Sequence, residues 1–160
     1  MEQDVRKKLV AQYKDGYRVV ADALEGITED ELDHAPAPGK WTPREIVHHL
    51  ADSEMTSAIR LRLLLASDRP RIMGYDQDVF AKQLHYHERS MTASLEAFKG
   101  ARATTGEILD HLTEPEWQRQ GTHSEIVGPY SVELWLEIYS VHAHNHGKQI
   151  RAARAAHLRK

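Results

Sequence analysis

The chain contains no cysteine, and this absence removes several kinds of chemistry at once. Disulfide bonds, thiolate ligands for a metal and a cysteine nucleophile are all excluded. No apolar run reaches the roughly 18 residues that a transmembrane helix needs. The charged stretch after Met1 is not followed by the apolar segment of a signal peptide. We therefore expect a cytoplasmic protein that does not enter a membrane.

A surplus of basic residues is also missing. Lys and Arg number 21 against 24 Asp and Glu, so the formal net charge is −3. Proteins that bind nucleic acid usually carry a basic surplus, and we expect no nucleic-acid partner. The apolar share of 41% and the charged share of 28% are ordinary for a globular domain. A chain of 160 residues can bury a sizeable core, and we expect residues 1–160 to form a single domain.

Apolar residues recur at steps of three and four along most of the chain, which predicts helices. The pattern covers residues 3–24, 43–66, 91–112 and 132–158. The strongest start signal is at Thr42, where Pro43 takes the first helical position and Glu45 completes a capping box. These four segments are long enough to pack against one another as a bundle.

Shorter features separate the four helices. Thr28 and Thr113 each open a capping box for a single helical turn, and residues 76–84 favour a short helix within the long connection 67–90. Residues 120–130 are rich in glycine and are expected to be loop, and no segment shows the alternation of a strand. The sequence therefore predicts an all-α four-helix bundle with a long connection between its second and third helices, a scaffold that often holds metal ions.

Histidine is what the chain has in excess, with eleven residues. It is the commonest metal ligand and the side chain that titrates near neutral pH. His142 and His146 lie four apart in the predicted last helix, so both side chains occupy one face, among apolar neighbours. Two imidazoles at this spacing can bind one divalent metal ion together. His144 points away from that face and is expected to be exposed.

A third imidazole is available in the predicted helix 43–66. His48 and His49 are adjacent there, and periodicity favours His49 only slightly. Three nitrogen ligands leave a position for water or substrate, as in catalytic sites, and suit zinc, nickel, iron or copper better than magnesium or calcium. Most histidine pairs of this spacing bind no metal, but burying three imidazoles without a shared ligand is costly.

The remaining histidines are isolated or lie in predicted loops. His85 and His87 are expected at the surface, with a contact to substrate at the rim of the site as the alternative. The others are expected to be exposed: His34, His111, His123 and His157.

Two segments together resemble a known family. Residues 41–55, WTPREIVHHLADSEM, resemble a helix motif of the DinB-like superfamily, nearest its YfiT-like branch, which includes bacillithiol transferases. Residues 142–150, HAHNHGKQI, resemble the closing motif of the same superfamily. Both occur in the expected order, and the predicted four-helix layout matches along the whole chain.

The resemblance implies a bundle that holds one divalent metal ion, usually zinc or nickel, through three histidines. The family's ligands fall on His49, His142 and His146, so the resemblance selects His49 over His48. It also implies a homodimer and the long connection between the second and third helices. His144 departs from the family pattern, because it adds a histidine inside the closing motif that can compete for metal in a purified sample.

The YfiT-like members resemble thiol S-transferases. The resemblance thus implies a metal ion that binds a low-molecular-weight thiol such as bacillithiol, lowers its pKa and holds the thiolate for attack on an electrophile, in detoxification. The absence of cysteine is compatible with this, since the thiol cofactor supplies the sulfur. Four cations are candidates for contacting the anionic thiol: Arg44, Arg60, Arg62 and Arg71.

Two alternative functions use the same histidines. A metal-dependent hydrolase activates a water on the ion and needs an acidic base nearby, for which Asp52 and Glu54 are the candidates. Asp52 is equally suited to orienting an imidazole from behind. A non-enzymatic metal- or ligand-binding bundle would instead have a closed apolar pocket without a solvent path to the metal.

Overall fold

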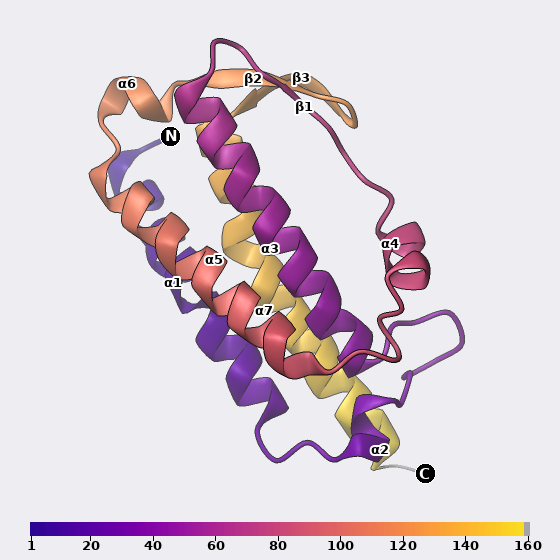
Figure 1. The fold of residues 1–160 in the computed structure, drawn as a ribbon. Helices are drawn as coiled ribbons and strands as arrows, with labels where there is room; N and C mark the ends of the chain where they lie inside the picture. Colours follow the sequence, from indigo (N-terminus) through magenta and orange to yellow (C-terminus); the bar gives the residue numbers. More distant parts are fainter. Residues whose placement is uncertain (159–160) are drawn as a thin grey trace.

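The structure, a computed structural model, describes residues 1–158. Four long helices form the predicted bundle, shown in Figure 1: α1 (Gln3–Leu24), α3 (Pro43–Ala66), α5 (Met91–His111) and α7 (Val132–His157). α1 packs chiefly against α7, and α3 packs chiefly against α5. α3 and α7 also lie against each other, so the two helices that carry the candidate ligands are neighbours.

The predicted helix starts are confirmed by their hydrogen bonds. At the start of α3 the Thr42 hydroxyl accepts from the N–H of Glu45, and the Glu45 carboxylate accepts from the N–H of Thr42. Pro43 occupies the first turn, where a backbone N–H has no acceptor within the helix, so the missing N–H of proline costs no hydrogen bond. This local pairing determines where α3 begins, and with it the depth at which His49 enters the bundle.

Three short helices lie outside the bundle. α2 (Glu29–Leu32) follows the capping box at Thr28, and α6 (Glu114–Trp117) follows Thr113, as predicted. α4 (Gln77–Gln83) lies in the long connection and confirms the predicted short helix. The Asp76 carboxylate begins α4 by accepting from two backbone N–H groups, those of Asp78 and Val79.

The prediction of a loop at residues 120–130 was wrong. β2 (Gln120–His123) and β3 (Ile126–Ser131) form an antiparallel hairpin, and β1 (Arg71–Ile72) pairs in parallel with β2. The buried positions of β2 are Gly121 and His123, so the strand has no apolar alternation to detect. A Cβ on Gly121 would lie 2.1 Å from the Pro70 carbonyl oxygen, so glycine permits the close approach. This small sheet is an addition to the helical bundle (Figure 1).

The core consists of two groups of buried side chains along the bundle. One surrounds Trp135, whose indole N–H donates to the Ser57 carbonyl at 2.9 Å. The other lies toward the start of α3 and the end of α7 and includes Leu50, Ala143 and Ile150. Within residues 1–158 no helix is both long and apolar enough to cross a bilayer.

The end of the long connection is tied to α3. His48 is fully buried, with Nδ1 2.8 Å from the Ser94 hydroxyl and Nε2 3.1 Å from the Arg89 carbonyl. Because a carbonyl only accepts, Nε2 donates and Nδ1 accepts from the serine. One turn further along α3, Asp52 accepts a hydrogen bond from the Tyr86 hydroxyl at 2.5 Å. Both nitrogens of His48 are therefore engaged, one with the end of the connection at Arg89 and the other with the beginning of α5 at Ser94.

Candidate metal centre

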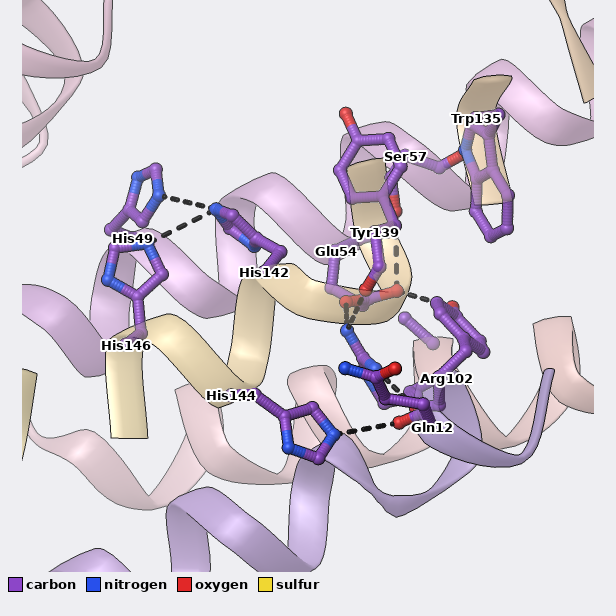
Figure 2. Close-up of polar contacts among 12 residues, drawn as sticks. Gln12, His49, Glu54, Ser57, Arg102, Trp135, Tyr139, His142, His144 and His146 are labelled. Carbon is purple, nitrogen blue, oxygen red and sulfur yellow. Dashed lines mark hydrogen bonds and ion pairs between the residues drawn. The ribbon is translucent and has the colours of Figure 1, made fainter. Parts of the chain in front are cut away.

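Three imidazoles meet between α3 and α7, as Figure 2 shows. Nε2 of His142 lies 3.3 Å from Nε2 of His49 and 3.2 Å from Nε2 of His146. One nitrogen from each ring lies within 4.8 Å of the others, and no second group of this kind occurs in residues 1–158. Tetrahedral zinc with Zn–N bonds of about 2.0–2.1 Å places its ligand nitrogens roughly 3.3 Å apart. The donor set and its spacing fit a divalent metal ion.

Burial keeps the three imidazoles neutral. Burial, together with the neighbouring His146, lowers the pKa of His49 to about 3. The pKa of His142 is lowered well below its ordinary value, first by burial and then by the two other imidazoles. Burial also lowers the pKa of His146, and the hydrogen bond to Gln149 opposes that shift. Metal ions bind the neutral imidazole, so all three rings are in the ligand form at neutral pH.

Neighbouring side chains hold the rings in position. Nδ1 of His146 lies 2.8 Å from the side-chain oxygen of Gln149, which can only accept; the proton is therefore on Nδ1, and Nε2 keeps its lone pair. The Trp41 ring packs against His49 at 4.7 Å, and the Tyr139 ring packs against His142 at 5.9 Å, between centroids. Nδ1 of His49 and Nδ1 of His142 are buried without a partner among the described residues.

The two acidic candidates do not contact the imidazoles. Asp52 instead accepts from the Tyr86 hydroxyl, so the expectation that it orients an imidazole was wrong. Glu54 is fully buried and accepts from Arg102 at 2.6 Å and from the Tyr13 hydroxyl (Figure 2). Within residues 1–158, no carboxylate joins the three-histidine group.

Four of the isolated histidines differ from the prediction of exposure. His144 is half-buried, and its Nε2 lies 3.0 Å from the Gln12 carbonyl (Figure 2). His34 and His157 are half-buried with ring centroids 5.1 Å apart, and His123, the last residue of β2, is buried. The error has a common cause: the local sequence around each histidine does not show which distant elements will cover it. The remaining histidines are exposed, as predicted: His85, His87 and His111.

The four candidate cations are also placed away from the imidazoles' cavity. Arg44 pairs with Glu29 and Asp33, and Arg60 donates to the Tyr139 hydroxyl and the Met73 carbonyl. The other two candidates are Arg62, which donates to Ala58 and Thr105, and Arg71, which is exposed. None of the four lines the cavity beside His146.

A cavity of about 550 Å³ reaches the imidazole cluster at His146. His146 and Gln149 form part of one wall, and Trp41 and Ile46 form an apolar part of another. The lining also includes three exposed polar side chains: Lys40, Gln77 and Asp78. The sequence prediction missed these three because they lie in a loop and a short helix far apart in the chain, where no local pattern marks them. Their exposure shows that the cavity is open to solvent.

The bundle and its three converging imidazoles define a helical protein with a candidate metal site between two of its long helices. The chain belongs to the DinB superfamily, whose family model matches residues 12–150. The resemblance based on residues 41–55 and 142–150 is thereby confirmed.

Individual relatives agree with this family. A Bacillus subtilis protein, "Putative metal-dependent hydrolase YfiT", is 32% identical over 124 residues, covering 78% of this chain and 70% of the relative. A protein of Oceanobacillus iheyensis with a similar name is 28% identical over 137 residues, covering 86% and 78%. The solved structure of Bacillus subtilis YfiT superposes with a TM-score of 0.89 at 27% identity, covering 96% of this chain and 87% of that one. It is described as a probable metal-dependent hydrolase with an unusual four-helix bundle topology.

Proposed function

We propose that this protein is a metal-dependent thiol S-transferase, in which His49, His142 and His146 hold one divalent ion, zinc or nickel. The observation that carries the proposal is a cluster of three neutral imidazoles that borders an open cavity at His146, with no carboxylate grouped with them in residues 1–158. When bound, a divalent ion lowers the pKa of a thiol and stabilises its thiolate. Neutral ligands leave the full charge of the ion available to an anionic sulfur.

The chain's own residues prepare the site for this chemistry. Gln149 keeps the proton of His146 on Nδ1, so that Nε2 faces the ligand position. Trp41 and Ile46 give the cavity an apolar wall, which limits water around the sulfur. In the transfer, sulfur attacks an electrophilic carbon, the C–S bond forms, and the leaving group departs with the electrons of its bond to carbon. The thiol proton passes to solvent.

The test uses protein purified without a histidine tag and loaded with zinc or nickel. Bacillithiol, mycothiol and glutathione are each supplied with monochlorobimane, and formation of the fluorescent conjugate is followed. We expect at least one thiol to react faster than in the uncatalysed reaction, and His142→Ala to abolish the gain. If no thiol reacts above the uncatalysed rate with either metal, the proposal fails.

A metal-dependent hydrolase is the second candidate. The names of the relatives favour it, and so does one observation: the Asp78 carboxylate lines the same cavity as His146, where a general base is needed. Hydrolysis of p-nitrophenyl acetate without any thiol, lost in Asp78→Asn with metal retained, would support it. The closed pocket expected of a non-enzymatic binder differs from the open cavity of this structure.

We further propose that the protein is a homodimer. The outer face of α3 exposes three apolar side chains one turn apart, Met55 at 43%, Ile59 at 58% and Leu63 at 40%. Apolar stripes of this kind are buried where subunits associate. Light scattering should give twice the chain mass, and Ile59→Lys should give the monomer mass. A monomer in the unmodified protein would contradict the proposal.

A further inference from the structure

Two unpaired charges of opposite sign line the cavity that His146 borders. Lys40 comes from the loop before α3, and Asp78 comes from the first turn of α4. Within residues 1–158, neither side chain forms an ion pair, with each other or with any other residue. Arg44, on the adjoining surface, instead pairs with both Glu29 and Asp33. The cavity therefore presents one free cation and one free anion to whatever enters it.

Both charged residues lie on segments whose backbone is held by local contacts. The N–H of Lys40 donates to the Ala37 carbonyl at 3.1 Å, across a turn in which Gly39 has a φ of 73°. Asp78 follows the capped start of α4, and the Tyr75 ring packs on Phe80 with centroids 4.4 Å apart. Together with the hydrogen bonds that tie the end of the connection to α3, these contacts hold α4 opposite the loop.

We propose that this cavity recognises its ligand as a zwitterion, with a carboxylate at Lys40 and an ammonium group at Asp78. The inference rests on the proposed function, because the ligand's thiol would then point toward the imidazole wall. In this proposal the long connection takes part in ligand binding, because it brings Asp78 to the cavity. The class of ligand is a small thiol whose two charged groups lie at separate positions.

The two charges limit the ligand further. Because Lys40 and Asp78 do not pair with each other, a ligand that satisfies both must itself carry an anionic and a cationic group. A small peptide with free amino and carboxylate ends meets this requirement and serves as the probe. Between the charges, Trp41 offers an apolar surface, while Gln77 and Gln149 offer amide groups for hydrogen bonds.

The test measures the Kd of four probes on the zinc-loaded protein by calorimetry, at about pH 6.5, where an α-amino group is charged. Cysteinylglycine carries both charges and the thiol. N-acetylcysteinylglycine lacks the ammonium, cysteinylglycine amide lacks the carboxylate, and alanylglycine lacks the thiol. We expect the loss of either charge to raise Kd about tenfold, because each charge-assisted hydrogen bond is lost.

Two variants assign each charge to its residue. Lys40→Gln should remove the preference over the amide and keep the preference over the N-acetyl compound, and Asp78→Asn should do the reverse. Lys82→Gln, on α4 outside the cavity lining, and Asp30→Asn, on exposed α2, are the matched controls and should keep both preferences. Equal binding of all probes, no binding of cysteinylglycine, or unchanged preferences in both cavity variants would overturn the inference.

The outcomes separate this inference from the proposed function. If cysteinylglycine binds more tightly than its N-acetyl and amide analogues but no thiol is transferred, the zwitterion site stands and the S-transferase proposal fails. If thiol transfer proceeds with unchanged KM in Lys40→Gln and Asp78→Asn, the S-transferase proposal stands and the charge assignment is wrong.

Discussion

Gln149 lies three residues after His146 on α7, and its side-chain oxygen accepts a hydrogen bond from Nδ1 of that imidazole at 2.8 Å. Of the three clustered imidazoles, His146 has its outer nitrogen satisfied in this way, whereas the outer nitrogens of His49 and His142 have no partner in residues 1–158. Gln149 thus selects the tautomer in which the inner nitrogen can bind a metal ion.

Replacing this partner should weaken metal binding without unfolding the protein. Gln149→Leu should raise the zinc Kd about 10–100-fold, because Nδ1–H loses its acceptor and the ring its orientation. Gln149→Glu supplies an acceptor and should restore affinity. Competition with a zinc-binding dye measures both values, with Lys148→Ala as an exposed control on the same helix. Equal affinities for the protein and Gln149→Leu would contradict this role.

The ligand assignment makes a prediction for single histidine variants. His49→Ala, His142→Ala and His146→Ala should each lose the bound ion, because two remaining imidazoles hold it weakly, while circular dichroism stays helical. His48→Ala and His144→Ala should keep one ion per chain, because their rings contact backbone and serine groups instead. Elemental analysis of tag-free protein gives the stoichiometry, and full metal content in any of the first three would refute that ligand.

The metal-free protein should lose stability in acid. The pKa of His49 is lowered from 6.5 to about 3 in the folded state, so the unfolded chain binds more protons below about pH 6.5. The free energy of unfolding keeps its full value, as far as His49 is concerned, above that pH. It decreases as the pH falls, by about 2 kcal/mol at roughly pH 5. His49→Gln removes this titration and should reduce the loss of stability in acid, although the lowered pKa values of His142 and His146 keep part of it. Urea unfolding at several pH values tests this, and parallel curves for both proteins would contradict it.

A buried ion pair in the bundle should contribute more to the free energy of unfolding than an exposed ion pair. Arg102, 2% exposed, donates to Glu54, 0% exposed, at 2.6 Å. Glu54→Gln leaves the guanidinium buried without its counter-charge and should lower the free energy of unfolding by about 3–5 kcal/mol. Lys14→Gln breaks the exposed pair with Asp110 and should change it by less than about 1 kcal/mol. Urea unfolding gives both values, and similar losses would contradict the expectation.

Local interactions explain why most of the fold was predictable. Thr42, Pro43 and Glu45 lie within one turn, and their hydrogen bonds determine the start of α3 without help from distant residues. β2 was missed because its buried residues are Gly121 and His123, and β3 was missed because Tyr130 is its one buried position. Apolar spacing therefore reveals helices well and does not reveal strands that bury one apolar side chain or none.

The sequence by itself determined the four long helices and the pair His142 and His146, since one helical turn places both on one face. Periodicity left the choice between His48 and His49 open and the family resemblance selected His49, but only the tertiary structure gives the physical reason. The nitrogens of His48 are taken by Ser94 and the Arg89 carbonyl, whereas His49 faces His142 from the neighbouring helix. His48 and His49 are adjacent, so the surrounding sequence hardly distinguishes them. The packing of distant segments gives each ring its own partners.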